Sequence, residues 1–433
     1  MELELASEKY LDVAKGEISL ISGLIFTTVM VALLPSGLSW TDVESSSISA
    51  DTSIMFRLQW GIIFAISALV VAQHRVRMLS NLLANRFLLV MLAYCAASAI
   101  WSPVPISTFT KVIQFSGLVL FCLAVQTSRR PWMHFLPVIL AAVTLVEFAS
   151  AVIAIVYPSL GMDAEFTTSW RGVTAGKNVL GRVGALGILL WLAHQRAKNF
   201  RSVAFWSGFG LSLLCLVMSK SSSSIIATVF GVFSFWILLK NRIQSPLWFQ
   251  RIVVSVSIAL LLLAHLFFVL EGHLPSQNEL LDPLAGLFGK DSDLTGRTAI
   301  WALLEIEIQK HFFFGIGYGA FWLGPGSAAQ SILDKLNWVP SQGHNGYLDI
   351  LNELGTVGII LFLGFIITII RGLHQLIYID RQATALFASM LITFLFFNMS
   401  ESTLFRGVHI HFLLTILISV SMTTALSQPE SRE

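Results

Sequence analysis

The polar run at residues 341–355 carries residue types that can do acid–base chemistry. It reads Ser-Gln-Gly-His-Asn-Gly-Tyr-Leu-Asp-Ile-Leu-Asn-Glu-Leu-Gly, and an apolar stretch follows it. His344 falls at the predicted start of a helix, and an imidazole with an unperturbed pKa of about 6.5 can accept a proton at neutral pH. Asn345, Asp349 and Glu353 recur every four residues and therefore share one helix face. A polar stripe that leads into a bilayer usually faces a cavity, so we expect Asn345 and Glu353 to bind substrate beside His344.

A structural interpretation of the same run stays open. Water alone can satisfy an interfacial histidine, and acidic residues near a helix start can serve as capping charges. The run by itself does not separate the two interpretations.

A second candidate site is the run Leu-Thr-Gly-Arg-Thr-Ala-Ile-Trp at residues 294–301. We predict that Thr295 caps a helix here. A helix N-terminus carries free N–H groups and a partial positive charge, and the guanidinium of Arg297 adds a fork of donors. The combination suits a phosphate or diphosphate. Alternatively, Arg297 pairs with Asp291 or Asp293, or lies on the loop surface.

The third candidate is the run Trp-Arg-Gly-Val-Thr-Ala-Gly-Lys-Asn-Val-Leu-Gly-Arg at residues 170–182. Arg171, Lys177 and Arg182 would form an electropositive pocket at one helix end, with Asn178 beside them. A charge within a span costs a few kcal/mol unless it is paired or hydrated. The alternative is that these side chains reach toward the lipid headgroups, which suits Lys177 better than Arg182.

Metal and redox chemistry are not predicted. Asp291 and Asp293 form a D-x-D pattern like that of metal-binding transferases, but two Asp before a helix are more often capping residues. Cys95, Cys122 and Cys215 each lie in an apolar run, which is typical of small buried residues rather than disulfides. We therefore expect no metal and no cofactor.

The composition requires a membrane to position these residues. Of 433 residues, 55% are hydrophobic and 12% are charged, whereas soluble domains carry about 25% charged residues. Such a chain has too little polar surface to be a soluble globule. The net charge of +2 gives no indication of nucleic-acid binding.

An all-α polytopic membrane protein with about twelve spans is predicted. A span needs about 20 mostly apolar residues. The candidates are 18–38, 54–72, 84–101, 107–126, 133–157, 178–194, 203–219, 224–240, 252–270, 354–371, 382–398 and 408–427. Lys and Arg are concentrated in alternate loops, which predicts an inner-membrane protein with both termini in the cytoplasm and all three candidate segments on the outer, periplasmic side.

One predicted outer loop, 271–346, is far longer than the others. Ile300, Leu304 and Ile308 recur at helical spacing within it, and its aromatic content is too high for a disordered segment. We predict a folded cap on the membrane surface. The expected organisation is one membrane domain, with spans one to nine in 1–270, the cap in 271–346 and spans ten to twelve in 347–433.

Three runs together resemble the O-antigen ligase and Wzy-type polymerase superfamily. They are T-G-R-T-A-I-W, H-N-G-Y-L-D-I-L-N-E-L-G-T-V-G and W-R-G-x-x-x-x-K-N-x-L-G. The resemblance covers roughly residues 165–365, and its order and spacing are most similar to the rhizobial polymerases of succinoglycan-type exopolysaccharide. It implies a membrane glycosyltransferase of the C type.

The resemblance also implies roles for individual residues. His344 would activate the acceptor, and Arg171 and Arg297 would bind the diphosphate of an undecaprenyl-diphosphate-linked oligosaccharide. A chain-length regulator and export proteins are further implied partners. In two places the chain departs from the pattern. Gly176 stands where many relatives have His, and Lys220 is the sole cation of a short loop where relatives often have Arg, which leaves Lys220 as the candidate for a substrate contact there.

Two other functions remain open. A ligase of the same superfamily would transfer a finished glycan to lipid A core instead of joining repeat units. A flippase or exporter of similar size would often consist of two similar halves, and the sequence shows no such similarity.

Overall fold

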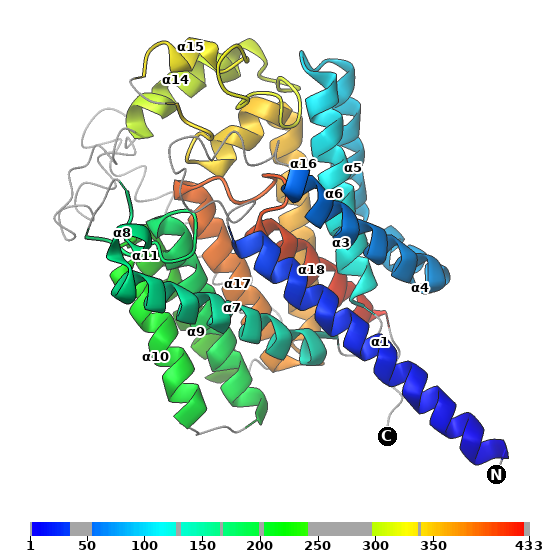
Figure 1. Cartoon of the computed structure of the whole chain (residues 1–433). Coiled ribbons are helices and arrows are strands. Elements are labelled where there is room, and N and C mark those ends of the chain that lie inside the picture. The colour runs from blue at the N-terminus through cyan, green and yellow to red at the C-terminus, as the bar shows by residue number, and fades with distance from the viewer. Residues whose placement is uncertain are drawn as a thin grey trace.

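The computed structural model describes residues 2–34, 54–126, 131–164, 168–198, 203–240, 297–336 and 339–427 (Figure 1). These residues form helices joined by loops. The β-type pairing in the described part of the chain is one isolated antiparallel bridge between Met162 and Trp170. The prediction of an all-α protein is therefore confirmed. The helices, in chain order, are α1 (Glu2–Leu33), α3 (Ile54–Gln73), α4 (Arg75–Ala84), α5 (Arg86–Ala97), η3 (Ser98–Ile100), α6 (Pro105–Ala124), α7 (Pro131–Val156), α8 (Pro158–Gly161), α9 (Lys177–Lys198), α10 (Val203–Met218), α11 (Ser222–Lys240), α14 (Arg297–Lys310), α15 (Gln330–Leu333), α16 (Gly346–Leu376), α17 (Arg381–Ser400) and α18 (Ile410–Leu426).

Several helices are apolar and long enough to cross a membrane. In the described ranges these are α3, α6, α7, α11, α16 and α17, and the pair α4 and α5, bent by 84°, is a seventh candidate. Predicted span 252–270 lies outside the described residues, and each of the other predicted spans falls largely on a helix. The chain is a multi-pass membrane protein, whereas the count of twelve spans stays a prediction.

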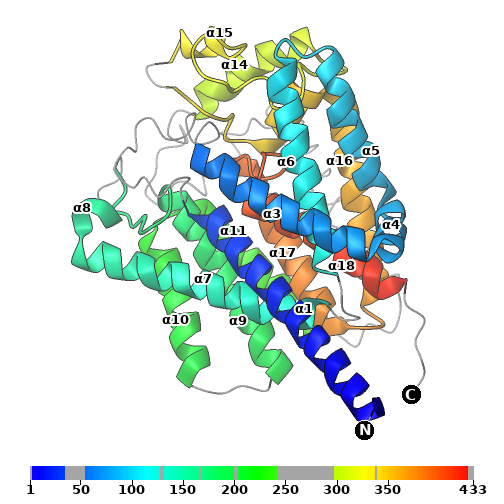
Figure 2. The ribbon, with the colours of Figure 1, turned by 45° about the vertical axis from the view of Figure 1, so that its right-hand side comes forward.

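Two helices near the C-terminus form the centre of the bundle. Helix α17 packs along α11, α9 and α16, and α18 packs along α16 and α6. Both helices are buried along most of their length. Figure 2 shows α7, α9 and α10 on one side of them and α5 and α16 on the other, with α3 crossing in front.

Helix α16 is interrupted at Gly355, where φ is 66°. The turn that follows α14 enters this break: the Thr356 N–H donates to the Phe312 carbonyl (2.9 Å), and the Val357 N–H donates to that of Phe313 (3.2 Å). A Cβ at Gly355 would lie 2.3 Å from the Phe313 carbonyl oxygen. Only glycine fits both the backbone conformation and this close approach.

The part of the predicted cap that is described, from residue 297 onward, is folded. Helix α14 buries Ile300, Leu304 and Ile308 against Phe321 and Trp322, as its periodicity predicts, and it packs on α16. Thr295, the predicted cap of α14, lies outside the described residues, and the division at 270 and 346 stays a prediction.

Candidate active site

Glu401, between α17 and α18, is a buried carboxylate surrounded by donors; it is 5% exposed. Its Oε1 accepts hydrogen bonds from Arg297 Nη2 (2.8 Å) and Asn178 Nδ2 (2.9 Å). Its Oε2 accepts one from Gln342 Nε2 (2.7 Å) and lies 3.3 Å from His344 Nδ1. Arg182 Nη1 lies 3.8 Å from the same oxygen. We call these six residues the Glu401 cluster: Asn178, Arg182, Arg297, Gln342, His344 and Glu401.

Segments far apart in the sequence bring the Glu401 cluster together. Asn178 and Arg182 lie four residues apart on α9 and therefore share a face. Arg297 is the first residue of α14, and His344 precedes α16 by two residues. The structure thus joins two of the three predicted catalytic residues, His344 and Arg297, and two of the predicted binding residues, Asn178 and Arg182.

The electrostatics of the cluster keep Glu401 ionised. Burial alone would raise the pKa of this carboxyl group. His344 and its hydrogen bond with Glu401, together with Arg182 and Arg297, hold the pKa of Glu401 well below the ordinary range of glutamate. The cluster therefore combines a fixed negative charge with two guanidinium groups and an imidazole.

Local backbone structure aims the ring of His344. Its φ is 49°, a left-handed conformation that is uncommon for a residue with a side chain. The Gly343 N–H donates to both oxygens of Asp349 (3.2 and 3.1 Å), and Asn345 caps α16 by accepting from the Tyr347 N–H (3.1 Å). The His344 side chain is 22% exposed, so the ring can be reached by a substrate. Strained conformations of this kind are concentrated at functional sites.

A second group of charges, which we call the Arg406 cluster, consists of Arg406, Asp349 and Glu353. Arg406 Nη1 lies 3.5 Å from Glu353 Oε1 and 4.0 Å from Asp349 Oδ2. Asp349 also accepts from Trp322 Nε1 (2.8 Å), and Glu353 accepts from the Gly319 N–H (2.8 Å). The carboxylates of the polar stripe predicted on α16, Asp349 and Glu353, therefore already accept hydrogen bonds from other parts of the protein. Substrate binding by Asn345 and Glu353 stays a prediction.

Arg171 lies on the segment that leads into α9, and Lys177 is the first residue of that helix. Arg171 is 8% exposed, and its Nε donates to the Leu160 carbonyl at 2.9 Å. The backbone N–H of Lys177 donates to Asp163 Oδ2 at 2.8 Å. The hydrogen bond from Arg171 to the Leu160 carbonyl anchors the loop that carries Arg171. That Arg171 lines the same cavity as His344, and that Lys177 binds substrate, both stay predictions.

Lys220 occupies the turn between α10 and α11. It is exposed and has φ 51°. The serines around it pack tightly on α9, because a Cβ at Gly181 would lie 2.8 Å from the hydroxyls of both Ser219 and Ser224. This contact holds α9 at Gly181, the residue before Arg182. A direct role of Lys220 in substrate binding stays a prediction.

The sequence alone assigned no role to Glu401, Arg406 or Gln342. A usable signal exists, since Glu401 and Arg406 are the charged residues of the short connection between two apolar helices. Their partners lie up to 223 residues away in the chain, and no local pattern reveals such pairings. Asp291 and Asp293, the candidate metal ligands, lie outside the described residues.

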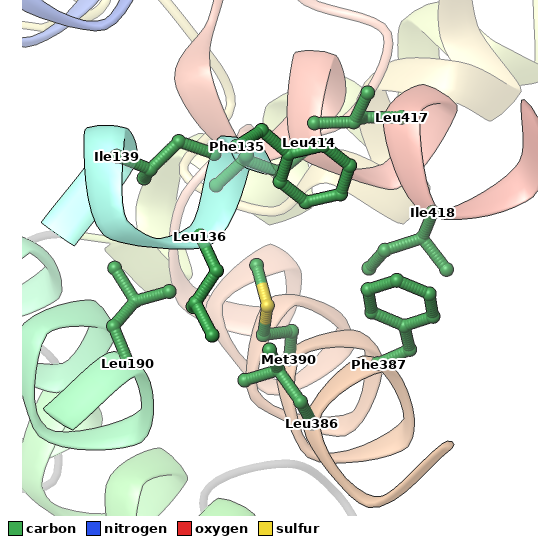
Figure 3. Close-up of a pocket in the computed structure, with 10 residues that line it drawn as sticks. All are labelled: Phe135, Leu136, Ile139, Leu190, Leu386, Phe387, Met390, Leu414, Leu417 and Ile418. Atoms are coloured by element: carbon green, nitrogen blue, oxygen red, sulfur yellow. The ribbon is translucent and has the colours of Figure 1, made fainter. Parts of the chain in front are cut away.

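The pocket shown in Figure 3 lies between α7, α9, α17 and α18 and is apolar. Phe135, Leu190, Met390 and Leu417 are among the side chains around it. Its cavity volume is about 10 Å³, at the lower limit for a single water molecule. It is a packing gap of the bundle core and is separate from the Glu401 cluster.

Comparisons with known proteins show what the chain is similar to. Residues 207–363 match the family described as O-Antigen ligase. The chain is 24% identical over 327 residues to "Exopolysaccharide production protein ExoQ" of Rhizobium meliloti (strain 1021), covering 72% of this chain and 71% of that protein. The predicted resemblance to the O-antigen ligase and Wzy-type polymerase superfamily is confirmed. The protein is thus similar to a glycosyltransferase-like class of membrane enzymes, and the O-antigen ligase match contains Arg297 and His344.

Proposed function

We propose that the chain polymerises exopolysaccharide repeat units. It would transfer a glycan from an undecaprenyl-diphosphate carrier to a hydroxyl of a second lipid-linked unit. The observation that supports this most is the convergence of Arg182, Arg297 and His344 on Glu401. The printed name of the Rhizobium relative, an exopolysaccharide production protein, favours the polymerase over other members of the superfamily.

In this proposal the arginines hold the diphosphate of the donor. The guanidinium of Arg297 presents several donors in one plane, which suits phosphoryl oxygens. As the bond between the anomeric carbon and the diphosphate oxygen breaks, its electron pair passes to the diphosphate. Arg297 and Arg182 stabilise the negative charge that develops there. A diphosphate is already a good leaving group, so the proposal requires no metal.

His344 would act as the base. With its Nδ1–H directed at Glu401 Oε2, 3.3 Å away, its Nε2 is the basic nitrogen. Nε2 takes the proton of the acceptor hydroxyl, whose oxygen forms the new bond to the anomeric carbon. Attack opposite the departing diphosphate inverts the linkage. Glu401 orients the ring and stabilises its protonated form, as carboxylates beside catalytic histidines do.

The proposed setting is the inner membrane, with both termini in the cytoplasm and the Glu401 cluster on the periplasmic side. The distribution of Lys and Arg among the loops supports this orientation. A chain-length regulator and export proteins are the partners expected around such an enzyme.

An O-antigen ligase is the second candidate, and the family description of residues 207–363 supports it. Reconstitution of the purified protein with lipid-linked oligosaccharide separates the candidates. A polymerase produces a ladder of longer glycans and releases lipid diphosphate without other substrates, whereas a ligase needs lipid A core. An exporter would move the oligosaccharide unchanged, and that result would reject glycosyl transfer. His344→Ala should remove the ladder while the protein still inserts into membranes.

A further inference from the structure

Three consecutive phenylalanines form the turn that follows α14, and their side chains are exposed. The exposed fractions of Phe312, Phe313 and Phe314 lie between 46% and 67%. We call these three residues the Phe turn. The chain carries no charged residue from the Phe turn to residue 320. A contiguous apolar surface of this kind marks a contact with a membrane or with another protein.

The backbone of the Phe turn is bonded to the break in α16. Its first two carbonyls accept the N–H groups of Thr356 (2.9 Å) and Val357 (3.2 Å). Its third carbonyl lies 3.1 Å from the hydroxyl of Tyr94, which is also 2.9 Å from the Leu354 carbonyl and can donate its one proton to either. A donor from the protein therefore lies at each carbonyl of the turn. Non-helical backbone is tolerated at membrane depth only where the protein satisfies its polar groups, and the Phe turn meets that condition.

The Phe turn adjoins the lipid-facing surface of α16. Thr356, whose N–H and hydroxyl both reach the turn, begins the segment after the break. Ile360, Leu363 and Ile367 follow it on the same helix face, and all three are exposed. Exposed apolar side chains on a helix long enough to cross a membrane face lipid. The Phe turn therefore continues this surface beyond the end of the span.

Two more aromatic side chains lie beside the Phe turn. The ring centroid of Trp101 lies 6.0 Å from that of Phe314 and 5.9 Å from that of Tyr94, and Trp101 is also exposed. Tryptophan and tyrosine are enriched at the interface between lipid and water. This composition favours a lipid interface over a protein partner.

We propose that the Phe turn inserts into the lipid leaflet on the side of the cap, with its three rings among the acyl chains and its backbone held by the break in α16. The turn thereby attaches the cap to the membrane at the C-terminal end of α14. Arg297 is the first of the 14 residues of this helix, which places it about 20 Å along the helix from the anchor. The anchor therefore holds Arg297 at a set distance from the membrane surface.

The test places a nitroxide spin label at position 313 and measures which relaxing agents collide with it. Phe313→Cys is labelled and studied in phosphatidylcholine nanodiscs that hold one copy of the protein. The native cysteines Cys95, Cys122 and Cys215 are buried, so wild type should take up little label. Oxygen is concentrated among acyl chains, whereas a water-soluble nickel chelate is excluded from them. We expect the ratio of oxygen to nickel collisions at position 313 to be high, as at Ile360→Cys on the exposed face of α16.

Lys335→Cys is the matched control that faces water, because Lys335 is exposed on the same cap, two residues after α15. The ratio at position 313 should exceed that at position 335 several-fold. Equal ratios at the two positions would overturn the inference, because the turn would then face water. A label at position 313 that neither agent reaches would also overturn it, because protein rather than lipid would then cover the turn.

A second measurement uses the wild-type protein and does not depend on the folding of any variant. Phosphatidylcholine with a diazirine in its acyl chain is photolysed in the same nanodiscs, and cross-linked residues are identified by mass spectrometry. Cross-links should appear on the Phe turn as well as on the exposed face of α16. Cross-links on α16 without any on the Phe turn would overturn the inference.

Discussion

Replacing Glu401 by glutamine removes a negative charge but preserves the size of the side chain. Arg182 and Arg297, whose side chains are 7% and 15% exposed, would then face each other without a carboxylate. Breaking a buried ion pair by removing one partner costs about 3–5 kcal/mol. With an unfolding entropy of about 2.1 cal/mol/K per residue, a chain of this length loses about 3–5 °C in Tm. Polymer formation should also fall sharply, because His344 and Arg297 lose the group that orients them.

The measurement is thermal unfolding in detergent, with Glu307→Gln as the matched control. Glu307 is on α14 with Arg297 and is 9% exposed, but its partner Lys310 is 53% exposed. Gln at position 307 therefore leaves no buried cation unpaired and should cost less than Glu401→Gln. The pH dependence gives a second check. The pKa of Glu401 is lowered by folding, so its stabilising contribution is present above the unfolded pKa of about 4.3 and is lost as pH falls below it. The difference in Tm between wild type and Glu401→Gln should persist from pH 8 to about pH 5 and shrink below about pH 4, as Glu401 itself becomes protonated.

A Glu401→Gln variant with wild-type Tm and wild-type polymer would refute this reasoning. So would a difference in Tm that grows as pH falls below about 4, because this would mean that folding raises the pKa of Glu401.

Three further predictions concern single side chains. His344→Gly should abolish polymer formation in an activity assay and lower Tm only slightly, because glycine adopts the φ of 49° without strain and this offsets part of the lost contact with Glu401. A large loss of Tm would contradict this prediction. Arg297→Lys should recover only part of the activity lost in Arg297→Ala, because an ammonium lacks the planar fork, and full activity with lysine would indicate nonspecific attraction. Gly346→Ala should cost about 1–3 kcal/mol in unfolding experiments, because its Cβ would lie 2.0 Å from Asn398 Oδ1, whereas the helical Gly210, with open space around it, should accept alanine without loss.

Local features of the fold were predictable from the sequence. The spacing of Ile300, Leu304 and Ile308 predicted α14, because helical periodicity acts over a few residues. The polar run predicted a helix start at His344, two residues before α16 begins at Gly346. Long apolar runs gave the bundle helices. The break at Gly355 was not predicted, since it depends on the turn at Phe313 that enters it from another part of the chain.

The site was predicted only in part, for a related reason. The residue types of His344, Arg297 and Arg182 indicated anion binding and proton transfer, and the structure places them around one carboxylate. That carboxylate, Glu401, is 104 residues from Arg297 and 57 from His344. Its importance comes from burial and tertiary packing, which no short pattern encodes.

The position of the break in α16 has a consequence for how this helix meets the lipid. At about 1.5 Å per residue, its 31 residues extend about 46 Å, well beyond a hydrocarbon layer of about 30 Å. The segment after Gly355, residues 356–376, is about 32 Å long and can cross that layer alone. Asp349 and Glu353 belong to the surplus length before the break. The chain can thus keep two carboxylates on a membrane helix without transferring either of them into hydrocarbon.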